Sequence, residues 1–146
     1  VRNVANLVPP YAPDAAYHGT SAALEFAVRA LQVQDIVVLG HAQCGGVKAL
    51  LEGTPSTVSD FVGQWMQIAE PARVRVMACP DLHDRQLACE HEVVRLSIEN
   101  LKTFWWVREA TEAGTLRLHG CYFGIRSGVL EVLGEDGKFA PVPDVA

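Results

Sequence analysis

His41 and Cys44 are the residues of this sequence best suited to chemistry, and they lie three positions apart just after an apolar run at 36–39. An imidazole and a thiolate on one turn can point at the same place, and both are good Zn²⁺ ligands. Gly45 and Gly46 follow, and glycine lets the backbone pass close to a bound molecule. The pattern predicts a metal site. The alternative is an ordinary turn with a hydrogen-bonded histidine and a packed cysteine.

Other cysteines and histidines form weaker groupings. His119 and Cys121 are two apart in a strand pattern and share a face, which is more typical of core packing with a hydrogen-bonded histidine. Cys89 and His91 are two apart in a helical pattern, where such positions do not face each other. Cys79 lies in an irregular segment with no strand leading into it. The sequence contains no nucleophile elbow, P-loop or G-x-G-x-x-G motif, so the first pair remains the leading candidate.

The elements around His41 and Cys44 have the order of an α/β domain. The continuous apolar run at 36–39 is typical of a parallel strand buried on both faces. Helical spacing of apolar residues precedes it over 24–31 and follows it over 47–51. Ligands of open α/β sheets bind beyond the carboxyl ends of the strands, which is where both side chains are expected.

The remaining periodicities complete a single α/β domain over 1–146, with a mostly parallel central sheet flanked by helices. They predict a short strand or strand exit over 1–8, a short helix over 61–69, a long charged helix over 84–103, helical structure ending at 113–114, strands over 115–123 and 129–133, and a surface tail. The charged run from Glu90 to Lys102 is interpreted as the solvated face of the long helix.

Composition narrows the classes of function. The 146 residues carry 12 Lys and Arg against 17 Asp and Glu, which argues against nucleic acid as the main partner. No apolar run approaches the ~20 residues of a membrane span, and no signal peptide is visible, so we expect no membrane partner. Four cysteines at irregular spacing in a chain with a sizeable core predict reduced thiols or metal ligands, and hence a cytoplasmic location.

Five ordered segments resemble the β-class carbonic anhydrases. They are VRNVAN at 1–6, SAALEFAV at 21–28, IVVLGHAQCGG at 36–46, SIENLKTF at 97–104 and LHGCYFGI at 118–125. That family holds zinc with two Cys and one His and interconverts CO2 and bicarbonate. The resemblance implies that His41 and Cys44 are two of the zinc ligands. Zinc lowers the pKa of its bound water to about 7, which makes hydroxide available to attack CO2.

The resemblance also implies roles for two other residues and a quaternary state. Gly45 matches the glycine beside the substrate pocket. Arg2 matches an arginine that, in some members, contributes to a second bicarbonate site, although a structural salt bridge is the alternative. Homodimers or higher homo-oligomers are expected.

The departures from the family concern its remaining zinc ligand. In the family, the second Cys ligand belongs to a Cys-x-Asp-x-Arg motif upstream of the segment that matches 1–6, and the motif also supplies an Asp–Arg pair. The printed sequence contains neither, so it offers no catalytic residue of that pair. The most similar segment, at 79–83, has His83 in place of the Arg of the motif. It also follows His41 in the chain, whereas the family motif precedes it.

The family pattern further implies an N-terminal helical arm, and a central strand between the segments at 1–6 and 36–39, which the chain lacks. We therefore expect a domain incomplete at its N-terminus. Either an upstream segment precedes Val1, or the chain is a truncated form with impaired zinc binding. Two other hypotheses remain open: a non-catalytic relative used for assembly or small-anion binding, and a thiol-based redox or sensing protein, which requires a low-pKa cysteine.

Overall fold

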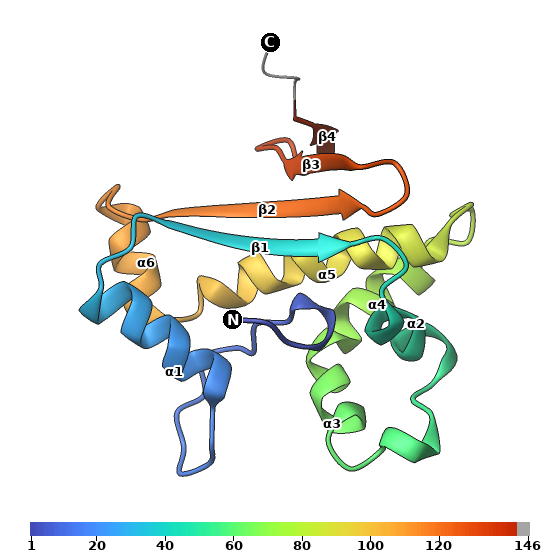
Figure 1. Ribbon diagram of the computed structural model, residues 1–146, viewed down its shortest axis with the longest axis horizontal. Coiled ribbons are helices and arrows are strands. Elements are labelled where there is room, and N and C mark those ends of the chain that lie inside the picture. The colour runs from blue at the N-terminus through green and yellow to red at the C-terminus, as the bar shows by residue number, and fades with distance from the viewer. Residues whose placement is uncertain (143–146) are drawn as a thin grey trace.

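The computed structural model, which describes residues 1–142, contains a four-stranded sheet with helices packed against part of it (Figure 1). The strands β1 (Asp35–His41), β2 (Arg117–Gly124), β3 (Val129–Leu133) and β4 (Phe139–Pro141) lie in that order. β1 and β2 are parallel, whereas β2–β3 and β3–β4 are antiparallel. The expected α/β class is confirmed, but the sheet is mixed rather than mostly parallel. The reason is that short turns join β2 to β3 and β3 to β4, and such turns can connect only antiparallel neighbours.

The helices occupy the remainder of the described chain. They are α1 (Gly19–Glu25), which continues as a π-helical turn (Phe26–Ala30), α2 (Gly45–Glu52), α3 (Val62–Met66), α4 (Glu70–Met77), α5 (Arg85–Leu101) and α6 (Trp105–Glu112), with short 3-10 turns at Val4–Asn6, Ser56–Val58 and Gln67–Ala69. Within residues 1–142, none of the helices is both long enough and apolar enough to cross a membrane.

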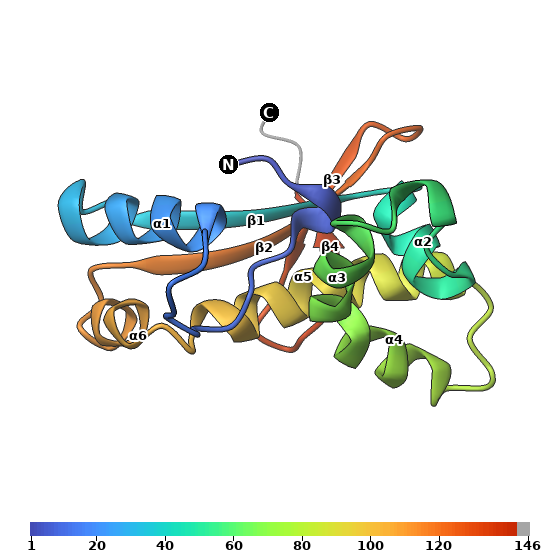
Figure 2. The ribbon, with the colours of Figure 1, turned by 90° about the horizontal axis from the view of Figure 1, so that it is seen from below.

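Helix α5 is the central helix of the fold. Asp84 caps its start by accepting a hydrogen bond of 2.9 Å from the backbone N–H of Leu87. The helix packs against β1 and β2 on one side and against α2 and α4 on another, and Figure 2 shows it running between α6 and α4. Its fully buried side chains include Val93, Val94 and Leu101. The long helix predicted over 84–103 is thus confirmed.

Strand β1 departs from the sequence expectation, because it is buried on one face only. Val38 is 6% exposed, whereas Val37 and Leu39 are 58% and 52% exposed. The prediction that 36–39 is buried on both faces is therefore wrong for the structure described. The physical reason is that α5 packs on the face of Val38 and Gly40, whereas the face of Val37 and Leu39 is left largely uncovered within residues 1–142.

The N-terminal segment 1–8 forms no strand, which corrects a second expectation. It contains a 3-10 turn in which Ala5 and Asn6 have left-handed φ values of 60° and 46°. Its backbone bonds to side chains of α5: Ser97 Oγ donates to Asn6 O at 3.0 Å and accepts from Val8 N at 3.2 Å, and Asn100 donates to Val8 O at 2.8 Å. These bonds take the place of a strand ladder.

We expect Ser97→Ala to lower the free energy of unfolding by about 1–3 kcal/mol, because it leaves the buried Val8 N–H and the half-buried Asn6 C=O without the Ser97 hydroxyl. Urea unfolding followed by circular dichroism measures the change. Ser59→Ala is the matched control, since Ser59 is exposed and bonds only to its own turn. Equal stabilities of the two variants would contradict this account of the N-terminal segment.

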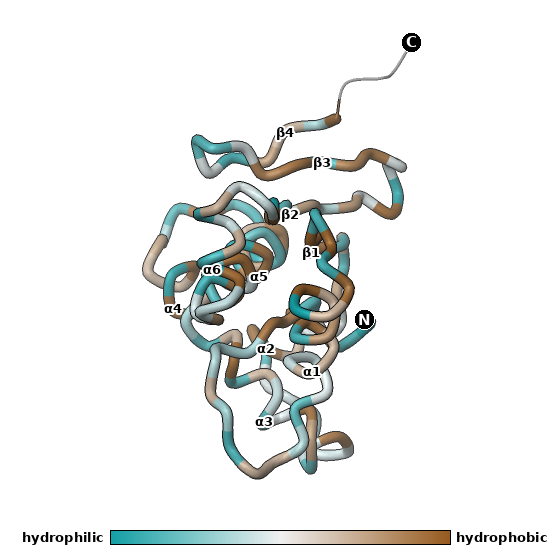
Figure 3. The backbone as a smooth tube through the Cα atoms, turned by 90° about the vertical axis from the view of Figure 1, so that its left-hand side faces the viewer, coloured by the Kyte–Doolittle hydropathy of each residue, from teal (hydrophilic) through white to brown (hydrophobic). Residues whose placement is uncertain are grey.

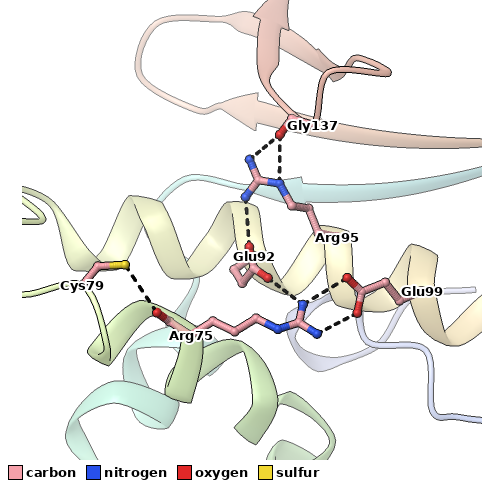
Figure 4. A network of polar contacts seen from close by, with 6 residues as sticks. All are labelled: Arg75, Cys79, Glu92, Arg95, Glu99 and Gly137. Carbon is pink, nitrogen blue, oxygen red and sulfur yellow. Dashed lines mark hydrogen bonds and ion pairs between the residues drawn. The ribbon is translucent and has the colours of Figure 1, made fainter.

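A network of ion pairs joins α4, α5 and the turn between β3 and β4 (Figure 4). Arg75 contacts Glu92 at 2.7 Å and Glu99 at 2.9 Å. Glu92 also contacts Arg95 at 3.1 Å, and Arg95 donates to the carbonyl of Gly137 at 2.8 Å. The hydrogen bonds that Arg75 donates to Glu99 and Glu92 hold its pKa above its usual value. Part of the charged run of α5 therefore connects elements instead of facing water alone.

The C-terminal region adds a strand that the sequence did not indicate. The turn at 134–138 leads into β4, so the predicted surface tail is ordered through Pro141, and residues 143–146 lie outside the described chain. Figure 3, which views the molecule from its side, shows β3 and β4 beyond the helices. The four cysteines form no disulfide within residues 1–142, in line with the expectation of reduced thiols or metal ligands.

Candidate metal-binding site

The turn after β1 carries both candidate metal ligands. His41 is the last residue of β1, in register with Phe123 of β2, and the N–H of Ala42 donates to the carbonyl of Phe123 at 2.9 Å. Gln43 then adopts a left-handed φ of 58°, which reverses the chain. Cys44 is the N-cap of α2. The structure thus places His41 and Cys44 on one turn at the carboxyl end of β1, where the sequence predicts them.

The imidazole of His41 is exposed and oriented by its own turn. Its Nδ1 lies 2.9 Å from the carbonyl oxygen of Ala42. Because a carbonyl can only accept, Nδ1 is the donor in this contact, and in the tautomer that donates from Nδ1 the lone pair lies on Nε2. Histidine ligands in metal sites use this arrangement, in which one nitrogen donates to the protein and the other binds the metal.

Cys44 is buried, with 5% of its surface exposed. Both its backbone N–H and its backbone C=O are hydrogen-bonded. Its N–H donates to Glu90 Oε1 at 2.8 Å. Its carbonyl accepts from Gln86 Nε2 at 3.1 Å and from the backbone N–H of Lys48 at 3.0 Å. Its side chain makes no capping bond to α2, so the thiol is not used to hold the turn.

Glu90 was missed by sequence reasoning, which placed it on a solvated helix face. It is 3% exposed and lies between α5 and the turn that carries Cys44. The correction has a simple cause: Glu90 precedes Val93, Val94 and Ser97 by three, four and seven positions, and residues at these spacings share one face of a helix. All three are fully buried, so the apolar stripe of α5 was the signal that could have identified a buried carboxyl group.

A groove of about 590 Å³ runs along the open edge of β1. Arg2 and His41 both line it, together with the exposed side chains of Val37 and Leu39. A second groove, of about 850 Å³, lies at the other end of the strands among Arg29, Trp105 and neighbouring residues, and none of the candidate site residues lines it. The first groove therefore joins two of the predicted site residues.

Comparison with known proteins identifies the family. The family model described as carbonic anhydrase matches residues 1–130. The chain belongs to the carbonic anhydrase family. Its relatives place it in the β class: β carbonic anhydrase 3 of Arabidopsis thaliana is 37% identical over 97% of this chain and 57% of its own length. The mitochondrial β carbonic anhydrase 6 of the same plant is 38% identical over 90% of this chain and 46% of its own.

Solved structures confirm the β-carbonic-anhydrase fold. The β-carbonic anhydrase CcaA matches with a TM-score of 0.85 and 28% identity, over 99% of this chain and 66% of that one. A structure from a study of two tetrameric β-carbonic anhydrases of Sordaria macrospora matches with a TM-score of 0.75 and 30% identity, over 92% of this chain and 66% of that one. This carbonic anhydrase chain spans about half the length of the curated relatives it matches.

The donor set of this carbonic anhydrase chain suits zinc but is partial. His41 offers an imidazole nitrogen and Cys44 a sulfur, which are ligand types that Zn²⁺ takes. Across residues 1–142, no three His, Cys, Asp or Glu side chains come close enough together to hold a metal ion. The two residues therefore fit two of the ligand positions of a zinc site, and the described residues do not complete such a site.

Gly45 and Arg2 are the other two residues predicted to belong to the site. Gly45 is the first residue of α2, and a side chain there would meet no atom within 4 Å, so the space beside Cys44 is open. Arg2 is exposed and makes no hydrogen bond or ion pair with the residues that the structure describes, so the alternative of a structural salt bridge is not observed there. Its role at a bicarbonate site stays a prediction.

The weaker groupings behave as structural residues. His119 Nε2 lies 2.7 Å from Asp35 Oδ1, and Arg117 contacts the same carboxylate, which accounts for this histidine. Burial raises the pKa of the Cys89 thiol to about 11 and also raises the pKa of Cys121. A redox thiol needs a lowered pKa, so these two cysteines do not support the redox hypothesis.

Proposed function

We propose that this chain is the carboxyl-terminal part of a zinc enzyme that interconverts CO2 and bicarbonate, with His41 and Cys44 as two of the zinc ligands. The observation that carries the proposal is the family match over residues 1–130 of a chain whose His41 and Cys44 share the turn at the carboxyl end of β1. Zinc held there by His41 and Cys44 would supply hydroxide at neutral pH, which is the nucleophile that CO2 hydration needs.

The chain's own residues have separate tasks in this proposal. The Ala42 carbonyl orients the His41 ring, and the helix-capping position of Cys44 presents its sulfur at the start of α2. Gly45 keeps open the space beside Cys44 that the substrate needs. Arg2 lines the same groove as His41, and its positive charge favours bicarbonate as an anion there.

The third zinc ligand and the Asp–Arg pair are assigned to a Cys-x-Asp-x-Arg motif, which the printed sequence does not contain. The protein is further proposed to act as a homodimer or larger homo-oligomer in the cytoplasm, with CO2 and bicarbonate as its small-molecule partners. The tetrameric β-carbonic anhydrases of Sordaria macrospora support the oligomer by analogy.

Metal analysis and stopped-flow CO2 hydration on the full-length natural protein test this function. We expect about one zinc per subunit, as in a catalytic zinc site, and hydration above the uncatalysed rate. A zinc-free protein that hydrates CO2 only at background rate would overturn the proposal and favour the non-catalytic alternative. The full-length sequence offers a cheap prior check, because that alternative expects no Cys-x-Asp-x-Arg motif.

A further inference from the structure

The backbone N–H and the backbone C=O of Cys44 each form a hydrogen bond with a side chain of α5. Glu90 Oε1 accepts the N–H of Cys44 at 2.8 Å, and Gln86 Nε2 donates to the carbonyl of Cys44 at 3.1 Å. The two side chains also bond to each other, since Gln86 Nε2 donates to Glu90 Oε1 at 2.7 Å. Two side chains one turn apart on α5 therefore bind both backbone polar groups of Cys44, which is distant from them in the sequence.

The carboxyl group of Glu90 is anchored at its other oxygen by the sheet. Tyr122 of β2 donates its hydroxyl hydrogen to Glu90 Oε2 at 2.8 Å. Tyr122 is 4% exposed, and its burial and its bond to Glu90 raise its pKa, so the phenol remains a donor. All three bonds to Glu90 are donated to it, which matches a carboxylate, because a carboxylate only accepts.

Packing alone gives no reason for a carboxyl group at this place. A buried charged group is costly, and an apolar residue of similar volume often serves a core as well or better. The turn, however, needs to be held: Gln43, just before Cys44, has a left-handed φ of 58°, and such a conformation persists only when its surroundings fix it. The side chain of Cys44 makes no capping hydrogen bond to α2. The turn is held at Cys44 by hydrogen bonds to its backbone N–H and C=O.

We propose that Glu90, together with Gln86 and Tyr122, is a positioning residue that fixes the Cys44 peptide and thereby aims the thiol at the metal. These three side chains are called the Cys44 clamp. Glu90 and Gln86 act through Cys44, since they bond to its backbone N–H and C=O, and Tyr122 acts by holding Glu90. The inference rests on the proposed zinc site, and residues that orient metal ligands in this way contribute to metal affinity.

The test measures zinc affinity by competition with a chelator in the full-length protein. Glu90→Ala leaves the Cys44 N–H without its acceptor, and we expect the zinc dissociation constant to rise roughly 10–100-fold. Glu90→Gln keeps an oxygen that accepts this N–H, so its affinity should lie nearer to that of wild type. Glu99→Gln is the matched control on the same helix, because Glu99 is exposed and contacts Arg75 instead; it should bind zinc as wild type does.

A second readout separates positioning from general loss of structure. In the cobalt-substituted protein, the sulfur-to-metal absorption band reports the geometry at Cys44, and we expect it to shift in Glu90→Ala and to return toward wild type in Glu90→Gln. Circular dichroism checks that each variant is folded. Should Glu90→Ala not fold, Gln86→Ala replaces it, because Gln86 is only partly buried and its loss removes the bond from α5 to the Cys44 carbonyl, which then keeps only the bond from the Lys48 N–H.

The outcomes distinguish the two proposals. A wild-type protein that binds no zinc contradicts the proposed function. A wild type that binds zinc, with a folded Glu90→Ala variant of unchanged affinity and unchanged cobalt band, overturns the clamp and leaves the function standing. Equal losses in Glu90→Gln and Glu90→Ala would also overturn it, because the charge and not the held peptide would then be the cause.

Discussion

Replacing Cys44 with serine, or His41 with alanine, is expected to abolish stoichiometric zinc binding by the full-length protein. Both residues lie on the turn between β1 and α2, and each offers one donor atom of a type that zinc takes. Removal of a ligand should exceed the roughly 10–100-fold effect that loss of a supporting contact causes. Metal analysis after dialysis against a weak chelator measures the remaining zinc, and CO2 hydration should fall with it.

Matched controls come from the same residue types elsewhere in the chain. Cys79→Ser changes an exposed thiol at the end of α4, and His83→Ala changes an exposed imidazole in the loop before α5. Both variants should keep the zinc content of wild type. Full metal occupancy in Cys44→Ser or His41→Ala would remove that residue from the site, whereas zinc loss in the controls would show that the assay reports general instability.

The sequence predicts the β1–turn–α2 unit well because its signals are local. An apolar run followed by His41, Cys44 and two glycines indicates a strand, a turn and a helix start without reference to any distant residue. The same holds for α5, whose Asp84 cap and apolar spacing lie within the helix and its border. The sequence therefore predicts correctly the elements that carry His41 and Cys44.

The exposure of β1 and the course of residues 1–8 were not predictable in the same way. Apolar residues at Val37 and Leu39 indicate burial on both faces, but the degree of burial depends on which strands and helices are neighbours. The segment 1–8 contains strand-forming residues, yet Ser97 and Asn100, about 90 positions away, accept or supply its hydrogen bonds. Pairings at this distance leave no local pattern in the sequence.

The burial of Glu90 was not predicted for a different reason. Its helical spacing from buried residues was visible in the sequence, but its charged side chain favoured the interpretation as a solvated residue. A carboxyl group in a run of charged residues is normally solvated, and Glu99 of the same helix is exposed as expected. Helical spacing, however, places Glu90 on the face of Val94 and Ser97. A charged residue on an apolar stripe, close in the fold to a ligand turn, is thus a better candidate for a supporting role than one in the middle of a solvated face.

Gly40 is the position where packing and the site are most directly coupled. A Cβ there would lie 2.7 Å from Cγ2 of Val94, and Gly120 on β2 likewise faces Cγ1 of Val94 at 3.0 Å. The two glycines let α5 approach the sheet, and Val94 is fully buried, so it has little room to move. Gly40→Val should therefore lower the free energy of unfolding by about 1–3 kcal/mol or more through overpacking.

The same change should also reduce zinc binding, because Gly40 directly precedes His41 and a helix displaced at Val94 carries Glu90 with it. Urea unfolding and metal analysis on one sample measure both effects. Gly63→Ala is the control, since a Cβ at Gly63 meets no atom within 4 Å and its φ is not left-handed; it should leave stability unchanged or slightly raised, and zinc content unchanged. A Gly40→Val protein as stable as Gly63→Ala would show that α5 does not need this close contact with β1. Unchanged zinc content in Gly40→Val would show that the turn with His41 and Cys44 does not depend on that contact.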